Sequence, residues 1–387
     1  MTPYTCSTDA IDRLIALRRD LNAHPELSYH EHRTTRVVAE FLQSAGLDVH
    51  TMPAGTGLWC DIGPIPPSVA LRADIDALPI GDTKDAPYRS VVDGAAHACG
   101  HDVHTAVLVG VALALDELNK AEQLPHGVRL IFQHAEEDWP GGAVEIIEAG
   151  GLAGIERIFA LHCDPSFEVG EIGLRVGAVT GASDHIEVNL AGPGGHSARG
   201  HLTADLVAAL GALAVHVPAL LARRVDARTG TVLVWGHINA GSAPNAIPKT
   251  GLIRGRIRTL SRDVWGELPP LVEELITSVA KPYGVDLSIN HIRGVPPVVN
   301  DERCIGILSD VVACAVTGGV VRQCPQSLGG EDFAWYVDRV PGAFLRLGVA
   351  APGSASTMDL HQSDFDVDET CIPIGVQTLV GAALAPL

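Results

Sequence analysis

The chain has 387 residues, which at about 100 to 200 residues per domain indicates two domains, or one domain with an insertion. Its hydrophobic content of 47% and charged content of 19% exclude disordered and collagen-like classes. The net charge of −19 repels nucleic-acid phosphates and anionic lipid surfaces, so neither nucleic acid nor a membrane is expected as a partner.

The expected location is the cytoplasm. The N-terminal stretch MTPYTCSTDAIDRL carries charge where a secretory signal needs an uninterrupted apolar run, and no run of about 20 apolar residues is apparent along the chain. The eight cysteines are scattered without a short repeating interval, so they do not indicate a disulfide framework. We expect most of them to be buried thiols.

Helices and short strands are predicted to alternate along the first part of the chain. Two helices are expected over 11–23 and 32–46, with Pro25 between them and Gly46 as the stop. The segments that follow alternate between strand and helix patterns, over 68–76, 105–118, 127–134, 142–150 and 155–162. This alternation indicates an α/β fold with a mostly parallel sheet covered by helices on both faces.

The pattern changes between residues 182 and 293. Four strands and two helices are expected there, over 185–192, 205–221, 231–241, 251–260, 264–284 and 285–292. They fit a compact α+β unit with an antiparallel sheet, mildly positive with 11 Lys and Arg against 9 Asp and Glu. The α/β pattern then resumes over 307–316, 343–350 and 372–385. We therefore predict a discontinuous domain, 1–181 and 294–387, interrupted by an inserted domain, 182–293.

The string HACGHDVH, residues 97–104, gathers a thiol and several imidazoles within eight residues. Cys99 and His101 are two positions apart, so their side chains point the same way if the segment is extended. That is the spacing of metal ligands. A glycine-hinged helix start with its histidines at the surface is the alternative interpretation.

Two adjacent carboxylates, Glu136 and Glu137, directly follow the apolar strand 127–134. Charge in that position costs free energy unless a cation or hydrogen bonds compensate it. If the backbone stays extended, the two side chains diverge, so that one can bind a metal while the other reaches a metal-bound water. A solvated acidic turn is the alternative.

The strands 155–162 and 68–76 also end in polar residues, His162 and Asp74. In open α/β sheets the ligand site lies beyond the carboxyl ends of the strands, although the residues that form it are far apart in sequence. We therefore expect one site at this edge of the sheet, built from Asp74, Cys99, His101, Glu136, Glu137 and His162.

Two segments near the C-terminus carry further candidates. His361 lies in a loop of small and acidic residues, 351–369, ahead of the last helix, where it can serve as a late ligand. Glu331 and Asp332 follow paired glycines, and Asp332 is expected at a helix start, where the helix macrodipole favours a carboxylate.

Three residues of the inserted unit suit a ligand that bears a carboxylate. His196 follows a glycine-rich stretch whose backbone can approach a ligand closely, Asn245 lies in a loop between prolines, and Arg258 lies on a predicted strand. The alternative, held equally, is that Arg258 is only a solvent-exposed side chain with no role in binding.

These motifs, in this order and over nearly the whole chain, resemble the aminoacylase/carboxypeptidase family of metallopeptidases. The resemblance is carried by HACGHDVHTA, FQHAEE with the following GGA, ALHCDP, GPGGHSARG, NAIP, GGEDFAWY and LHQSDFDVDE. The opening RRDLNAHPELSYHE and LRADIDALP agree with it. The match is to the amidohydrolase branch, which includes hippurate hydrolase, N-acyl-L-amino-acid amidohydrolase and the plant hydrolases of auxin conjugates.

The resemblance implies a two-metal centre in a discontinuous catalytic domain, with an inserted ferredoxin-like lid that also mediates homodimerisation. It implies that Glu136 is the general base, that Asp74 orients a ligand imidazole, and that His196 reaches into the partner's site to stabilise an oxyanion. Asn245 and Arg258 would bind substrate. The implied metal ligands, with the Cys99 thiolate bridging both ions, are Cys99, His101, Glu137, His162 and His361.

The implied reaction is metal-dependent hydrolysis of an N-acyl or N-aroyl amino acid to a carboxylic acid and an amino acid. The thiolate and imidazoles favour Zn²⁺, whereas the carboxylates and the family also admit Mn²⁺, Co²⁺ or Ni²⁺. His134 stands where relatives commonly have proline, which leaves the substrate choice open.

Two alternatives remain: a dipeptidase or carboxypeptidase using the same centre, and a non-catalytic metal- or ligand-binding protein on the same fold. Glu136 argues against the second. The chain has neither G-x-S-x-G nor G-x-x-x-x-G-K-[ST], which disfavours a serine hydrolase and a nucleotide enzyme.

Overall fold

The computed structural model describes residues 4, 6–353 and 358–387, and these form two compact units. Unit 1 comprises Met1–Gly177, Val299–Pro325 and Asp332–Leu387, and unit 2 comprises Ala178–Val298 and Gln326–Glu331. The second segment of unit 2 was not foreseen from the sequence. It belongs there because Gln326 donates a hydrogen bond to the carbonyl oxygen of Ala178 at 3.0 Å and the Ser327 N–H donates one to Val179 at 2.9 Å.

Unit 1 is built on an eight-stranded sheet with the order β1-β2-β4-β3-β5-β16-β6-β15. The four strands at its centre are parallel, whereas β1, β2 and β6 add antiparallel pairings. The expected mostly parallel sheet is confirmed. The strands are β1 (Val49–Thr51), β2 (Leu58–Ile62), β3 (Pro67–Asp74), β4 (Gly127–Gln133), β5 (Arg157–Glu168), β6 (Glu171–Leu174), β15 (Val320–Gln323) and β16 (Gly342–Ala350).

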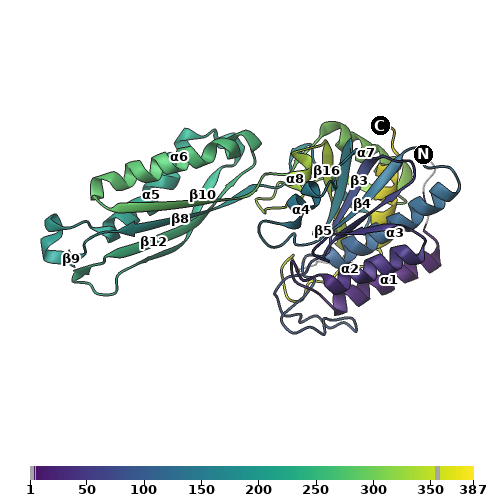
Figure 1. Ribbon diagram of the computed structural model, residues 1–387, viewed down its shortest axis with the longest axis horizontal. Helices are drawn as coiled ribbons and strands as arrows, with labels where there is room; N and C mark the ends of the chain where they lie inside the picture. Colours follow the sequence, from purple (N-terminus) through teal and green to yellow (C-terminus); the bar gives the residue numbers. More distant parts are fainter. Residues whose placement is uncertain (1–3, 5, 354–357) are drawn as a thin grey trace. The chain divides into compact units, whose positions relative to one another are not determined.

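The helices of unit 1 lie on both faces of this sheet (Figure 1). Successive side chains of a strand point to opposite faces of the sheet, which explains the two layers. On one face, Leu71 and Phe159 pack in the main core with α3 and α9. On the other face, Arg72 and Phe344 contact Phe333 at the start of α8. The helices are α1 (Thr8–Ala23), α2 (His32–Ser44), α3 (His101–Lys120), α4 (Gly142–Glu148), α7 (Glu302–Ala315), α8 (Ala334–Val337) and α9 (Cys371–Leu384).

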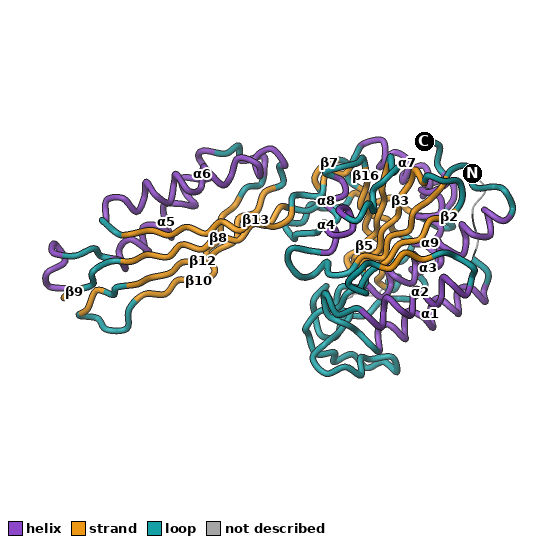
Figure 2. The backbone as a smooth tube through the Cα atoms, viewed as in Figure 1, coloured by secondary structure: helices purple, strands orange, loops and turns teal. Residues whose placement is uncertain are grey.

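Unit 2 has a four-stranded antiparallel sheet with the order β10-β12-β8-β13, and α5 and α6 pack on the sheet and on each other (Figure 2). A two-stranded ladder, β9 with β11, extends beyond it. The elements are β8 (Ala182–Ala191), β9 (Gly195–His196), α5 (Leu206–Arg224), β10 (Val232–Ala240), β11 (Ala246–Ile247), β12 (Thr250–Thr259), α6 (Arg262–Ala280) and β13 (Asp286–Val295). The short strands β7 (Gly177–Ala178) and β14 (Val299–Asn300) flank it in sequence.

Helix α5 is, among the described residues, the one helix long and apolar enough to cross a membrane by length and composition alone. A core helix can meet the same criterion, and the apolar run of this helix is interrupted by His216 and Pro218 and ends in two arginines. Its Leu206, Leu210, Leu213 and Val217 are buried within unit 2.

A buried arginine ties the first helix of unit 1 to segments more than 80 positions away. Arg18 on α1 is 1% exposed and donates hydrogen bonds to Asp102 at 2.7 Å, Asp366 at 2.9 Å and Glu369 at 3.2 Å. Burial alone would raise the pKa of Asp102, but the Arg18 guanidinium outweighs it, and this pKa is lowered to about 2. The cluster holds the start of α3 against the loop that precedes α9.

Replacing Arg18 by Met should lower the free energy of unfolding by about 3 to 5 kcal/mol, because it leaves buried carboxylates without their counter-ion. Arg19→Met is the matched control, since Arg19 pairs with the same Glu369 from a half-exposed position and should cost at most about 1 kcal/mol. Chemical denaturation followed by circular dichroism measures both. Equal losses in the two variants would contradict this account.

Candidate metal centre

Cys99 and His101 lie on either side of Gly100, where the loop after residue 94 turns into α3. Gly100 has φ 86°, and a Cβ there would lie 2.9 Å from Sγ of Cys163, so only glycine fits this turn. The helix begins at His101, and both Cys99 and His101 are buried. The glycine-hinged helix start of the alternative interpretation is therefore present, but its histidines do not lie at the surface as that interpretation expected.

Two groups of three predicted ligands come together in unit 1. In each group the ligand atoms all lie within 4.8 Å of one another: one group is Cys99, His101 and His162, and the other is Cys99, Glu137 and His361. Sγ of Cys99 lies 3.4 Å from Nε2 of His162, and Nε2 of His361 lies 3.3 Å from Oε1 of Glu137. Cys99 belongs to both groups, as a ligand that bridges two ions would.

Two of these ligand atoms are buried and lack hydrogen bonds within the described part of the chain: Nε2 of His101 and Oε1 of Glu137. Buried polar atoms without partners are rare because each one costs free energy. His101 belongs to the first of these groups and Glu137 belongs to the second. Thiolate, imidazole and carboxylate are also the donors that divalent transition metals take in proteins. The donor set therefore fits a pair of metal ions.

The ligand imidazoles are oriented by hydrogen bonds at their other ring nitrogen. Nδ1 of His101 lies 3.1 Å from Oδ1 of Asp76 and 3.0 Å from the carbonyl oxygen of the same residue. Nδ1 of His162 lies 2.7 Å from the carbonyl oxygen of Cys163. With Nδ1 engaged in each ring, Nε2 is left for a metal. The sequence analysis missed Asp76, although it lies only two positions beyond Asp74.

Asp74 occupies a different position from the one expected. Its Oδ1 accepts a hydrogen bond from Nδ1 of His104 at 2.5 Å, while Nε2 of His104 accepts one from the Cys163 N–H at 2.9 Å. The nearest ligand nitrogen, Nε2 of His101, is 3.7 Å from Asp74. Asp74 thus supports the backbone next to His162 through His104, and the carboxylate within hydrogen-bond distance of the predicted ligand His101 is Asp76.

Acidic groups dominate the electrostatics of the centre. Burial disfavours a charged His101, but Asp74, Asp76 and Glu137 outweigh it and raise the pKa of His101 to about 10. Burial and the carboxylates of Glu137 and Glu136 raise the pKa of the Cys99 thiol well above its usual value. Negative charge from the neighbouring carboxylates contributes to both shifts, and bound cations would displace the protons that these groups hold.

The two glutamates reach the centre through a turn and not along an extended strand. Strand β4 ends at Gln133, and Ala135 is buried with φ 49°, in the left-handed region. The Glu137 N–H donates a hydrogen bond to Oδ2 of Asp76 at 2.9 Å. Carboxylate oxygens of Glu136 and Glu137 lie within 4.8 Å of a ring nitrogen of His101. The condition of an extended backbone is therefore not met at Ala135, but Glu136 still lies beside the predicted ligands.

His361 enters the centre from its loop by pairing with the segment that carries Cys99. Its N–H donates a hydrogen bond to the carbonyl oxygen of Ala98 at 2.7 Å, and its φ of 63° is left-handed. Phe365 packs with Cys99 in a small apolar cluster, which fixes the loop on its other side. Residues 354–357 of the predicted loop lie outside the described residues.

Asp332 serves a buried network that includes the start of α4. Its Oδ1 accepts a hydrogen bond from Arg72 at 2.7 Å, and its Oδ2 accepts bonds from Gln133 at 2.6 Å and from the Ala143 N–H at 3.1 Å. Arg72 also donates to Asp74 at 2.6 Å. The network therefore holds β3, β4 and α4 together beneath the centre.

Unit 2 holds the three remaining predicted residues at two separate places. His196 pairs with Ala246 across the β9–β11 ladder, and the neighbouring Ser197 N–H donates to the carbonyl oxygen of Asn245 at 3.1 Å. Arg258 lies near the other end of β12, where it pairs with Ser183 and donates to the carbonyl oxygen of Leu328. Asn245 and His196 thus lie together, and Arg258 does not join them within one chain.

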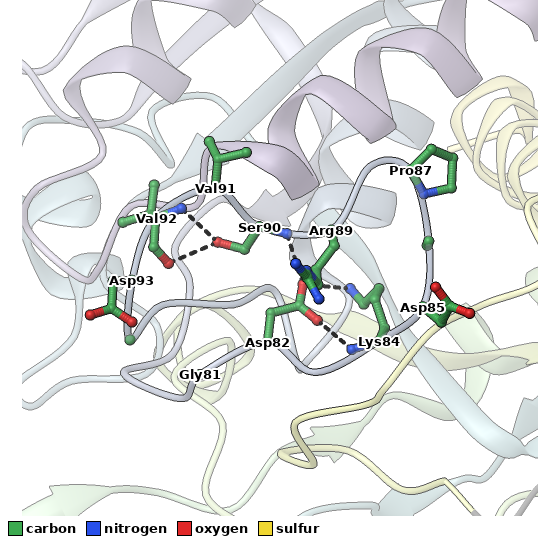
Figure 3. Close-up of a pocket in the computed structure, with 12 residues that line it drawn as sticks. Gly81, Asp82, Lys84, Asp85, Pro87, Arg89, Ser90, Val91, Val92 and Asp93 are labelled. Atoms are coloured by element: carbon green, nitrogen blue, oxygen red, sulfur yellow. Dashed lines mark hydrogen bonds and ion pairs between the residues drawn. The ribbon is translucent and has the colours of Figure 1, made fainter.

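Unit 1 also has a hollow of about 730 Å³ inside the loop 81–94, which contains none of the predicted site residues. Figure 3 shows Asp82 in this loop accepting hydrogen bonds from the Ser90 N–H and from Lys84. The loop is fixed to the His361 segment by the bond from the Thr83 N–H to the carbonyl oxygen of Ser363 at 2.7 Å. The lining is of mixed charge, with Asp82, Asp85 and Asp93 beside Lys84 and Arg89.

Comparison with known proteins gives the family. The model of peptidase family M20/M25/M40 matches residues 70–385. The chain belongs to this family. It is 36% identical over 362 residues to an N-acetyl-L-cysteine deacetylase of Bacillus subtilis, covering 93% of this chain and 85% of that protein. A dinuclear metal-binding M20 peptidase of Bacillus subtilis has a solved structure that superposes with a TM-score of 0.84 at 32% identity, covering 98% of each chain.

A further relative is a longer protein. A protein of Rhodococcus jostii named as a putative glutamate–cysteine ligase is 48% identical over 379 residues, which is 97% of this chain but 47% of that protein. The chain thus spans about half the length of that relative.

The M20 membership confirms the resemblance found in the motifs and makes the protein a hydrolase of a metal-dependent, amide-cleaving family. The two groups of ligands agree with a dinuclear centre of the kind that the Bacillus subtilis peptidase binds. The identity of the metal is not fixed by these ligands, since thiolate and imidazole suit several ions.

The shared ligand predicts how each substitution changes the metal content. Cys99→Ala should lose both ions, whereas His162→Ala and His361→Ala should each lose about one, because each removes a donor from one group only. Elemental analysis of the purified variants after dialysis against limiting metal gives the stoichiometry. Retention of two ions by Cys99→Ala would rule out the bridging position.

Proposed function

We propose that this M20 protein hydrolyses the amide bond of N-acyl or N-aroyl amino acids, releasing a carboxylic acid and a free amino acid. The observation that carries the proposal is a pair of ligand groups sharing Cys99, with the carboxylate of Glu136 beside them. A purely metal-binding protein does not need that additional carboxylate. A hydrolase needs it as a general base.

The proposed ligands are Cys99, His101, Glu137, His162 and His361. Two divalent ions held by these residues would supply Lewis-acid chemistry: they would lower the pKa of a bound water and polarise the scissile carbonyl group. Zn²⁺ or Mn²⁺ suits this donor set best, and Co²⁺ and Ni²⁺ are also compatible with it.

Glu136 accepts the proton of the attacking water and returns it to the leaving amine, so one carboxylate serves as base and then as acid. It is partly buried next to Glu137, where the surrounding backbone fixes its position. His196 donates a hydrogen bond to the oxyanion of the tetrahedral intermediate. Asn245 and Arg258 bind the substrate, with Arg258 suited to its carboxylate.

The names of two relatives suggest which N-acyl amino acid to assay first. One is named an N-acetyl-L-cysteine deacetylase, and the matched region of another is part of a protein named as a glutamate–cysteine ligase. A hydrolase that releases cysteine and a ligase that consumes it would act in succession. We therefore place N-acetylcysteine first among the N-acyl amino acids to be assayed.

We also propose that the protein works as a homodimer formed through unit 2, acting there as a lid. Helix α5 neighbours the edge strand β10, and both carry exposed apolar side chains. Val207, Val215, Val234 and Ile238 are each more than half exposed. Apolar groups beside an unpaired strand edge favour association with a second copy. The dimer would let His196 serve the partner's centre.

A reducing compartment, the cytoplasm, suits the protein. All eight cysteines lie among the described residues and are free thiols, and seven of them are buried.

Glu136→Gln should reduce kcat about 10²- to 10⁴-fold while the protein still binds two metal ions, because the substitution removes the base and keeps the ligands. The measurement is turnover by the metal-loaded enzyme on N-acetylcysteine, other N-acetyl amino acids, N-benzoylglycine and free dipeptides. Wild-type rates in the variant would refute the role of Glu136. Faster cleavage of free dipeptides than of every N-acyl amino acid would favour the dipeptidase alternative.

Val215→Asp should convert the dimer to a monomer and lower activity without changing the metal content, because it buries a charge at the proposed interface. Gly266→Asp is the matched control: it adds the same charge at an exposed position on α6 with no neighbouring atoms within 4 Å of a Cβ. Light scattering coupled to gel filtration reports the mass. A monomeric wild-type protein, or a Val215→Asp variant that remains dimeric, would contradict this interface.

A further inference from the structure

The turn that delivers Glu136 and Glu137 contains a backbone conformation that its residue does not favour. Ala135 has φ 49°, is fully buried, and directly precedes Glu136. For an L-residue with a Cβ, the left-handed region has a higher free energy than the right-handed and extended regions. The conformation therefore persists only where contacts with the surrounding structure stabilise it. A small change at Ala135 would redirect both glutamates.

Three hydrogen bonds hold this turn. The Ala135 N–H donates to Oε1 of Glu31 at 2.7 Å, and the carbonyl oxygen of Ala135 accepts from the Gly142 N–H at 2.9 Å. The Glu137 N–H donates to Asp76 at 2.9 Å. The backbone of Glu136 is therefore anchored on both sides by carboxyl groups, Glu31 before it and Asp76 after it.

Glu31 is an unusual residue for this task. It precedes α2, its side chain is fully buried, and its Oε2 has no hydrogen-bond partner among the described residues. A buried carboxyl group with one unsatisfied oxygen is costly, and a purely apolar side chain would avoid the cost. What Glu31 supplies in return is the acceptor for the Ala135 N–H.

We propose that Glu31 is a positioning residue that holds the left-handed turn at Ala135 and thereby aims Glu136 at the reacting atoms. The proposal rests on the proposed function, because it takes Glu136 as the base. Burial, and after it the carboxylate of Asp76, raise the pKa of Glu31 to about 8, so the group is mostly uncharged at neutral pH. Glu31 therefore accepts the hydrogen bond from the Ala135 N–H as a neutral group, and the side-chain oxygen of a glutamine can accept the same bond.

The test compares Glu31→Gln with Glu31→Met and Glu31→Asp in the full metal-loaded protein. Glutamine keeps an acceptor oxygen in place, methionine removes it, and aspartate withdraws it from Ala135 without changing the charge type. We expect kcat within about threefold of wild type for Glu31→Gln, and a loss of about 10- to 100-fold for the other two with KM little changed. Glu31→Asp keeps the test open if the methionine variant does not fold.

Glu26→Gln and Glu26→Met are the matched controls. The Glu26 carboxylate also accepts backbone hydrogen bonds at the start of α2, from Arg33 at 3.0 Å and Thr34 at 2.7 Å, but none from the Ala135 turn. Its methionine variant should lose stability without a comparable loss of kcat. If Glu26→Met loses as much kcat as Glu31→Met, or if Glu31→Met and Glu31→Asp keep wild-type kcat, the positioning role is wrong.

Hydrogen exchange of the peptide over residues 133–139 gives a readout that does not depend on turnover. In the metal-free protein, exchange there should accelerate about tenfold or more in Glu31→Met and stay near the wild-type rate in Glu31→Gln. Unchanged exchange in Glu31→Met would overturn the anchoring of Ala135. An inactive wild-type protein with the expected exchange pattern would instead point to a failure of the proposed function.

Discussion

The centre of unit 1 depends on the compensation of buried negative charge. Burial, together with Glu137, Glu136 and Asp74, raises the pKa of the Cys99 thiol. At His101 burial acts against the charged ring, but Asp74, Asp76 and Glu137 outweigh it and raise the pKa. Hydrogen bonds within the described chain leave Nε2 of His101 and Oε1 of Glu137 unsatisfied. Cations are the species that satisfy this arrangement completely, since they neutralise the carboxylates and take the nitrogen and sulfur lone pairs.

That constraint explains how the surrounding structure is organised. The proposed ligands come from the start of α3, the turn after β4, strand β5 and the loop before α9. Each of these segments is secured by a contact outside the proposed ligand set. Asp76 serves two of them, because it orients His101 and accepts the Glu137 N–H. Ala98 accepts the His361 N–H, and Cys163 accepts from the ring of His162. If a supporting contact is lost, the ligand side chain is no longer held in place, and metal binding must then offset the conformational entropy that is lost when the side chain is fixed.

The ligand candidates could be predicted from the sequence because the strands of a parallel sheet share one edge. Glu137 follows the apolar strand β4, and His162 follows the apolar residues in the first half of β5, which continues to Glu168. The supporting contacts could not. Glu31 and Ala135 are 104 positions apart, and Glu137 and Asp76 are 61 apart. No local pattern distinguishes Asp76 from Asp74 or marks an alanine for positive φ. The alternating elements of unit 1 were predictable from periodicity, whereas the addition of Gln326–Glu331 to unit 2 depends on pairing through space.

The placement of residues within unit 2 bears on how a substrate could be held. Thr250 and Arg258 are eight positions apart on β12, which is about 27 Å at about 3.4 Å per residue, and His196 and Asn245 lie near the Thr250 end. In an N-acyl amino acid, the carbonyl carbon that becomes tetrahedral and the carboxylate carbon are separated by only three bonds. His196 at the oxyanion and Arg258 at the carboxylate therefore cannot both come from one copy of unit 2. If both residues act on one substrate, two chains must supply them, so that dimerisation becomes part of building the site.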